Sequence, residues 1–190
     1  MTRRLLPIAL AAALVLSLSA CGNKVDTVTQ GESEAEYVTL DAMQYQVQIS
    51  RQLNAAEVGD RDYLVGLNPA DRQLKANEVW FGVWVSVVNK SGATHVSADT
   101  FKIVDTRGRE YETVQQSQVN RFAYRPAPVG GDGGDRAQLP LPGSAAYGSP
   151  VSGALLVFKL PVDALDFRPL ELAFSNSSAP KTESTIRLDV

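Results

Sequence analysis

Residues 79–88 of this chain, VWFGVWVSVV, constrain its fold more than any other stretch. On one side of an extended backbone the run places Val and Phe at alternate positions, and on the other side it places Trp80, Trp84 and Val88. A strand that is apolar on both faces has to be covered by protein on both faces, and β-branched residues favour the extended backbone. The stretch therefore predicts a central strand in a buried sheet.

Further strand signals lie on both sides of this run. Residues 43–50 alternate apolar and polar side chains, which is the pattern of a strand with one buried and one solvated face. Residues 101–104 and 109–114 flank a turn that contains Gly108, and this arrangement predicts a hairpin. Further strands are predicted toward the C-terminus, over residues 152–160, 167–174 and 185–190.

These strand signals, with little helix between them, predict an all-β fold: an immunoglobulin-like antiparallel β-sandwich of about seven strands. A small barrel is the alternative. The one helical signal is a turn with Asn54 as its N-cap, expected to stop by Gly59. Residues 115–150 contain five prolines and the run GGDGGD, and they predict a long Pro/Gly-rich loop. A connection of this length without regular structure is often functional.

The start of the chain has the pattern of a secretory signal. Two arginines precede an apolar stretch over residues 5–18, and small residues lead to Cys21, the only cysteine. This order predicts a signal peptide over residues 1–20. Its end, Leu-Ser-Ala-Cys, resembles the lipobox of bacterial lipoproteins, in which the cysteine is lipidated and becomes the new N-terminus. An uncleaved transmembrane helix is the alternative, but the stretch is shorter than the roughly 20 apolar residues that a span needs.

Lipidation of Cys21 predicts a protein held by its lipid anchor on the extracytoplasmic face of a cell membrane. Residues 21–36 have few apolar side chains and predict a flexible tether, and residues 37–190 have the length of one domain. Removal of residues 1–20 leaves 16 basic and 21 acidic side chains, a net charge of −5. This acidic balance argues against a nucleic-acid partner.

Three segments together resemble a known family: VWFGVWVSVVN at 79–89, FKIVDTRG at 101–108, and GALLVFKLP at 153–161 followed by PLEL at 169–172. They are similar to the immunoglobulin-like domain of many uncharacterised bacterial lipoproteins and of secreted mycobacterial immunoprotective antigens. The resemblance covers about residues 77–175. It implies an immunoglobulin-like sandwich at the cell surface, and it supplies no catalytic residues. This chain departs from the family in its longer, Pro- and Gly-rich segment before Gly153.

Sequence signatures of enzymes are few. His95 is the only histidine, so a metal site with several histidines is excluded, and a catalytic triad would depend on the fold to assemble it. The nucleophile-elbow, phosphate-loop and dinucleotide-binding motifs are absent from the sequence. We therefore expect no enzymatic activity and no cofactor. Asp132 and Asp135 in the glycine-rich run are weak candidates for Ca²⁺ binding, because Ca²⁺ takes six to eight oxygens; a solvated loop is the preferred interpretation.

Aromatic and arginine side chains are the remaining candidates for binding. Tyr124, Arg125 and Tyr147 lie in the long loop, where such residues either anchor a partner or hold the loop on the sandwich. Trp80 and Trp84 share one strand face and would form a platform for sugar or peptide if that face were exposed. The favoured function is a lipid-anchored domain that presents its loops to a protein or cell-wall partner. The alternatives are a small-ligand or calcium-binding accessory protein of the envelope, and an envelope hydrolase that uses His95.

Overall fold

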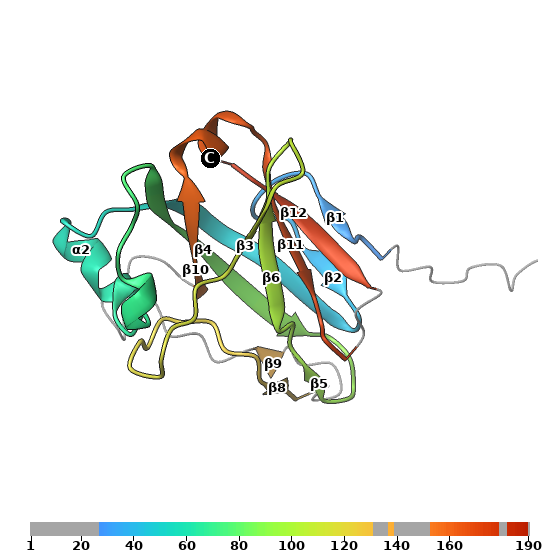
Figure 1. The fold of residues 1–190 in the computed structure, drawn as a ribbon. Helices are drawn as coiled ribbons and strands as arrows, with labels where there is room; N and C mark the ends of the chain where they lie inside the picture. The colour runs from blue at the N-terminus through green and yellow to red at the C-terminus, as the bar shows by residue number, and fades with distance from the viewer. Residues whose placement is uncertain (1–26, 131–136, 139–152, 179–181, 190) are drawn as a thin grey trace, which may run out of the picture.

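Two β-sheets pack face to face in the computed structural model, which describes residues 27–130, 137–138, 153–178 and 182–189 (Figure 1). The first sheet has the strand order β10-β4-β3-β2, with β9 also paired to β4, and the second has the order β1-β12-β11-β6-β7. The predicted all-β sandwich is confirmed.

Most strand pairs in both sheets are antiparallel. The first sheet consists of β2 (Val38–Leu40), β3 (Met43–Leu53), β4 (Glu78–Asn89), β9 (Ala137–Gln138) and β10 (Ala154–Pro161). The second consists of β1 (Gln30–Gly31), β6 (Thr100–Val104), β7 (Glu110–Glu112), β11 (Leu170–Ser175) and β12 (Glu183–Leu188). A separate pair joins β5 (His95–Val96) to β8 (Pro128–Val129). The helices are α2 (Val58–Arg61) and three short 3-10 helices over Asp62–Leu64, Pro69–Asp71 and Val162–Asp166.

Strand β4 occupies the central position that its sequence predicts, between β10 and β3. Its face with Phe81, Val83 and Val85 packs into the main core between the two sheets. Its other face, with Trp80 and Trp84, packs into a second apolar cluster. That cluster lies under the segment of α2 and the following 3-10 helices, and under the chain around Phe122. Each apolar face of β4 is therefore covered by a different part of the protein: one by the second sheet, the other by the helical segment and the chain around Phe122.

One helix and one strand begin clearly later than the sequence predicts. The helix α2 begins at Val58 and runs through Gly59, whereas Asn54 forms a turn in which its Oδ1 accepts a 2.9 Å hydrogen bond from the Ala56 amide. Within this helix, Asp60 is paired with Arg51 on β3, and its Oδ1 lies 2.6 Å from the guanidinium. A 3-10 helix follows Pro161, so β11 begins three residues later than predicted, at Leu170. The 101–104 hairpin forms as predicted, with Gly108 at φ 75°.

Part of the predicted tether belongs to the sandwich. Residues 30–31 form β1, which pairs in parallel with β12, and the Thr39 amide donates a 2.6 Å hydrogen bond to the Val28 carbonyl. Glu34 accepts hydrogen bonds from Ser50 on β3 and from the Asp189 amide. The predicted domain boundary at residue 37 is therefore too late. Backbone pairing attaches this polar segment without any apolar periodicity in its sequence.

Candidate functional site

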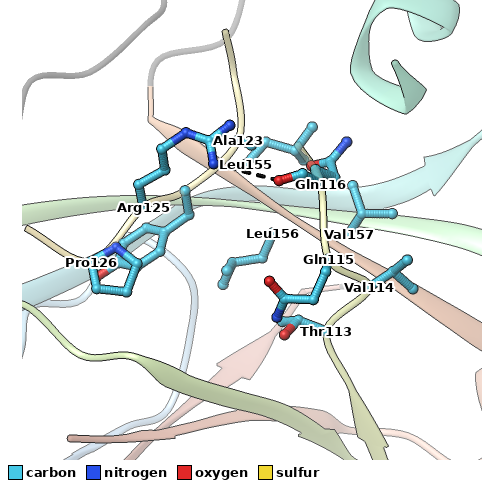
Figure 2. A pocket seen from close by; sticks show the side chains of 11 residues that line it. Thr113, Val114, Gln115, Gln116, Ala123, Arg125, Pro126, Leu155, Leu156 and Val157 are labelled. Carbon is cyan, nitrogen blue, oxygen red and sulfur yellow. Dashed lines mark hydrogen bonds between the residues drawn. The ribbon is translucent and has the colours of Figure 1, made fainter. Parts of the chain in front are cut away.

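A groove opens along β10, the edge strand of the first sheet (Figure 2). It is bounded on one side by residues 113–116 and on the other by residues 123–126, and its volume is about 210 Å³. Figure 2 shows Leu156 between the two walls, with Pro126 on one side and Thr113, Val114 and Gln115 on the other.

Both walls of the groove are joined to β10 by backbone hydrogen bonds. The Val114 amide donates to the Val157 carbonyl at 2.7 Å, and the Tyr124 amide donates to the Leu155 carbonyl at 2.8 Å. The Leu155 amide in turn donates to the Phe122 carbonyl at 2.7 Å. Leu155 and Val157 carry these bonds because alternate residues of an edge strand direct their backbone groups away from the sheet. The groove lies where the two wall segments diverge from the strand.

Tyr124 holds one wall of the groove in place. Its hydroxyl donates a 2.9 Å hydrogen bond to the Ala98 carbonyl, and its ring packs edge-on against Phe101 with centroids 4.8 Å apart. Burial of the phenol raises the pKa of Tyr124 well above its ordinary value, so the hydroxyl stays protonated and remains a donor. Of the two readings that the sequence left open, the structure supports the one in which Tyr124 fastens the loop to the sandwich.

Arg125 performs a similar role within the loop. Its guanidinium donates to three carbonyls of the turn that joins the two walls, those of Ser117 at 2.7 Å, Asn120 at 3.2 Å and Gln116 at 3.4 Å. These bonds close the turn over residues 116–120. The side chain is half-buried at the groove. Arg125 therefore shapes the site, and the structure brings it together with Tyr124.

Two amide side chains, which no sequence pattern marks, join the turn over residues 116–120 to the backbone of residues 63–65. Asn120 is 2% exposed, and its Nδ2 donates to the carbonyls of Tyr63 at 2.9 Å and Val65 at 3.0 Å. Gln116 Nε2 donates to the Tyr63 carbonyl at 2.7 Å. A single Asn or Gln in a polar loop carries no periodic signal, so sequence reasoning had no means of finding these contacts.

The structure assigns Trp80 and Trp84 to the second apolar cluster. Trp80 is 3% exposed and Trp84 is fully buried. Lys159 Nζ lies 5.2 Å from the centroid of Trp80, and the Tyr63 ring meets Trp84 edge-on at 5.1 Å. The alternative of an exposed aromatic platform is wrong, because the segment after β3 and the chain around Phe122 cover this face.

An ion-pair cluster occupies the turn between β6 and β7. The buried carboxylate of Asp105 accepts hydrogen bonds from the backbone and side chains of Arg107 and Arg109 and from the Tyr111 hydroxyl. Burial by itself would raise the pKa of Asp105, but the bonds from Arg109 and Tyr111 outweigh it and hold this pKa below its ordinary value. Asp163 lies 3.2 Å from Arg107 and 3.3 Å from Arg109. Each acid of the cluster is paired with arginines, so the arrangement stabilises a turn.

The other predicted site residues are less informative. His95 lies on β5, where its backbone pairs with Val129. Tyr147, Asp132, Asp135 and Cys21 lie outside the described residues. Among the residues that the structure describes, no three His, Cys, Asp or Glu side chains are grouped so that they could hold a metal ion. In the same ranges, every helix is too short or too polar to cross a bilayer.

Comparison with known sequences finds no match. No family model matches the chain, and no curated protein is similar to it in sequence. The resemblance to mycobacterial antigens is therefore a prediction from the sequence motifs.

Comparison with solved structures finds similar folds at low sequence identity. The "putative lipoprotein (ycdA)" of Bacillus subtilis matches with a TM-score of 0.50 and 12% identity, over 83% of this chain and 39% of that one. The yjhA protein of Bacillus subtilis matches with a TM-score of 0.49 and 10% identity, over 83% of this chain and 99% of that one. An uncharacterized beta-sandwich protein of Clostridium difficile matches with a TM-score of 0.42 and 10% identity, over 84% of this chain and 95% of that one. At such identities the likeness to the first of these concerns the fold alone: this chain is a β-sandwich.

Proposed function

We propose that this chain is a non-enzymatic, lipid-anchored extracytoplasmic module that binds a partner through the groove between residues 113–116 and 123–126. The lipobox-like segment ending at Cys21 supports the anchor, as does a structural neighbour described as a putative lipoprotein. The groove supports the binding function. It combines apolar lining residues with polar ones, and hydrogen bonds hold both of its walls.

The size and lining of the groove favour a protein partner. A volume of about 210 Å³ suits one large side chain, and a single apolar side chain in a fitted pocket is a common anchor of protein interfaces. Leu156, Val114 and Pro126 provide apolar contacts, while Gln115 and Thr113 stand at the same opening with polar groups.

Preformed walls favour tight binding. The bonds of Arg125 to three carbonyls and the contacts of Tyr124 hold the loop in one conformation before any partner arrives. Binding to an ordered loop avoids the conformational entropy cost of ordering it. This is the observation on which the proposal chiefly rests: Tyr124 and Arg125, two of the loop residues that the sequence marks as binding candidates, build the pocket rather than project from it.

The position of the groove agrees with an anchored module. In Figure 1 the yellow loop and α2 lie on one side of the sandwich, and β1, which leads toward Cys21, lies on the other. A membrane anchor at the β1 side would leave the groove side accessible to partners in the surrounding compartment.

The test is site-specific photo-crosslinking in the producing cells with the full chain. A photoreactive residue is placed at Gln115 on the groove rim or, as a control, at exposed Gln48 on β3. We expect one cross-linked protein species from Gln115 and none from Gln48. The same species should disappear when Thr113→Trp fills the groove. Equal cross-linking from both positions, or a species unaffected by Thr113→Trp, would contradict the proposed site. A cross-link to glycan would replace the protein partner with a cell-wall one.

A further inference from the structure

Two large apolar side chains are exposed beside the N-terminal edge of the sandwich. Val28 is 45% exposed and Tyr37 is 46% exposed. They are neighbours in the fold, because the hydrogen bond from the Thr39 amide to the Val28 carbonyl places Val28 against β2, which begins directly after Tyr37. Lys90, also exposed, has its Nζ 5.7 Å from the centroid of the Tyr37 ring. We call Val28, Tyr37 and Lys90 the N-terminal patch.

The point where the chain leaves this patch is fixed in the fold. The Thr185 amide donates a 2.9 Å hydrogen bond to the Thr29 carbonyl, and Gln30 and Gly31 are paired in register with β12. Val28 is therefore held at the surface. Only seven residue steps separate it from Cys21, and these span at most about 25 Å when fully extended. A compact domain of this length is roughly 40 Å across. A membrane anchor at Cys21 would keep the N-terminal patch nearer the bilayer than the opposite side of the domain.

We propose that the N-terminal patch is the surface with which this domain contacts the interfacial layer of a lipid bilayer. The inference rests on the proposed lipid anchor and adds an orientation to it. The patch has the side chains that such a layer accommodates. A tyrosine ring places its apolar body among the upper acyl chains and its hydroxyl among the headgroups, and a lysine extends its ammonium to the same level. Val28 adds apolar area to this contact.

The charges around the patch define the type of lipid contact. Glu36 adjoins Tyr37, and Asp41 follows β2; both are exposed. The patch thus has one cation, with two acids close to Tyr37 in the sequence, which differs from the clusters of four or more cations that attract proteins to anionic lipids. The contact therefore depends on Tyr37 and Val28, and we expect it to be insensitive to salt and to the fraction of anionic lipid.

The test measures how close two opposite sides of the domain lie to the bilayer. The full lipidated chain is reconstituted into phosphatidylcholine vesicles whose upper acyl chains carry bromine, which quenches tryptophan at short range. Tyr37→Trp and Val28→Trp report on the patch. Val119→Trp is the matched control, because Val119 is 76% exposed and lies in the turn beside the groove. Native Trp80 and Trp84, at 3% and 0% exposure, add the same background to each variant.

Each outcome bears on the proposal. The expected result is that bromolipid quenches the added tryptophan of both patch variants at least about twice as strongly as that of Val119→Trp, at low and high salt alike. If all variants sediment with the vesicles but show equal quenching, the N-terminal patch is not the contact surface, while the anchor stands. If the chain with an intact Cys21 does not sediment with vesicles, the anchor itself is wrong and the inference falls with it. Unchanged melting temperatures would establish that each variant is folded.

Discussion

The Thr185 amide donates a 2.9 Å hydrogen bond to the carbonyl of Thr29, so the last strand of the sandwich is joined to residues close to the start of the described chain. This bond continues into the parallel pairing of β1 with β12. It covers an edge of the second sheet that would otherwise present unpaired backbone groups. Residues 28–31 therefore form a clasp on β12.

Gly31→Ala is expected to weaken the clasp. A Cβ at Gly31 would lie 2.9 Å from Val38 Cγ2, and such crowding in a packed site costs about 1 kcal/mol or more of unfolding free energy. For a domain of this size that corresponds to a fall in melting temperature of roughly 2–4 °C. Gly92→Ala is the control, since a Cβ there meets nothing within 4 Å. Equal melting temperatures for the two variants would show that the clasp contributes little to stability.

Asp105→Asn is expected to destabilise the turn between β6 and β7. The Asp105 side chain is fully buried, and its carboxylate accepts hydrogen bonds from Arg107, Arg109 and Tyr111. An amide in its place removes the charge and presents a donor to three donors, which we expect to cost about 2 kcal/mol at neutral pH. Asp163→Asn is the control, because Asp163 is 52% exposed and exposed pairs contribute only about 0.5 kcal/mol. Urea unfolding of both variants measures the difference.

The same variant gives a pH dependence with a defined sign. The pKa of Asp105 is lower in the folded protein than its ordinary value, because bonds from Arg109 and Tyr111 outweigh burial. A carboxylate of this kind contributes its full stabilisation above its unfolded-state pKa of about 3.9 and loses it as the pH falls through the lower folded-state pKa. The gap in unfolding free energy between wild type and Asp105→Asn should therefore be constant from pH 7 to 5 and shrink below pH 4. If the difference in unfolding free energy persisted in strong acid, it would not arise from the charge of the Asp105 carboxylate.

Trp84→Ala tests the assignment of the tryptophan face to the core. Trp84 is fully buried and meets Tyr63 edge-on, and removing so large a buried ring costs about 3–5 kcal/mol. We expect a strong loss of unfolding free energy in denaturant titration. Val162→Ala, at a 49% exposed position, should remain within about 0.5 kcal/mol of wild type. A stable Trp84→Ala variant would mean that this face is not a packed core.

Arg125→Met tests whether the groove walls are preformed. The substitution keeps an unbranched side chain but leaves the carbonyls of Gln116, Ser117 and Asn120 without the guanidinium. We expect faster amide hydrogen exchange over residues 116–120 with an overall loss of about 1 kcal/mol in stability. Arg187→Met, which removes exposed contacts to Glu32 and Glu171, is the control and should leave that turn unchanged. Unaltered exchange in Arg125→Met would show that other contacts hold the loop.

Cys21→Ala tests the lipid anchor. Cys21 follows a lipobox-like segment, and two acyl chains hold a protein on a membrane where one holds it only marginally. The variant is expected to retain residues 1–20 and to carry no acyl chain, and mass spectrometry would detect both. Ser19→Ala is the control, since it leaves the cysteine in place. A Cys21→Ala chain that still loses residues 1–20, or that still carries acyl chains, would contradict lipidation at Cys21.

Side-chain periodicity alone was sufficient to predict much of the sandwich. The two-faced run of β4, the alternation of β3 and the hairpin around Gly108 are local patterns, and each is present in the structure. Such patterns are visible because a strand repeats every two residues, so burial on one face leaves a regular trace in the sequence. Burial of Trp80 and Trp84 follows from the same pattern once β4 is central.

Only the tertiary structure decided how the N-terminal segment and the loop are used. Residues 28–36 are polar and gave the appearance of a tether, yet they are held by β12 and by Ser50. Arg125 and Asn120 donate hydrogen bonds to backbone carbonyls of distant or neighbouring loop residues. Backbone pairing between distant segments does not depend on side-chain type and therefore leaves no pattern to find. The sequence by itself determined where strands form and which faces are apolar, whereas the edge pairings and the groove depended on contacts between residues far apart in the chain.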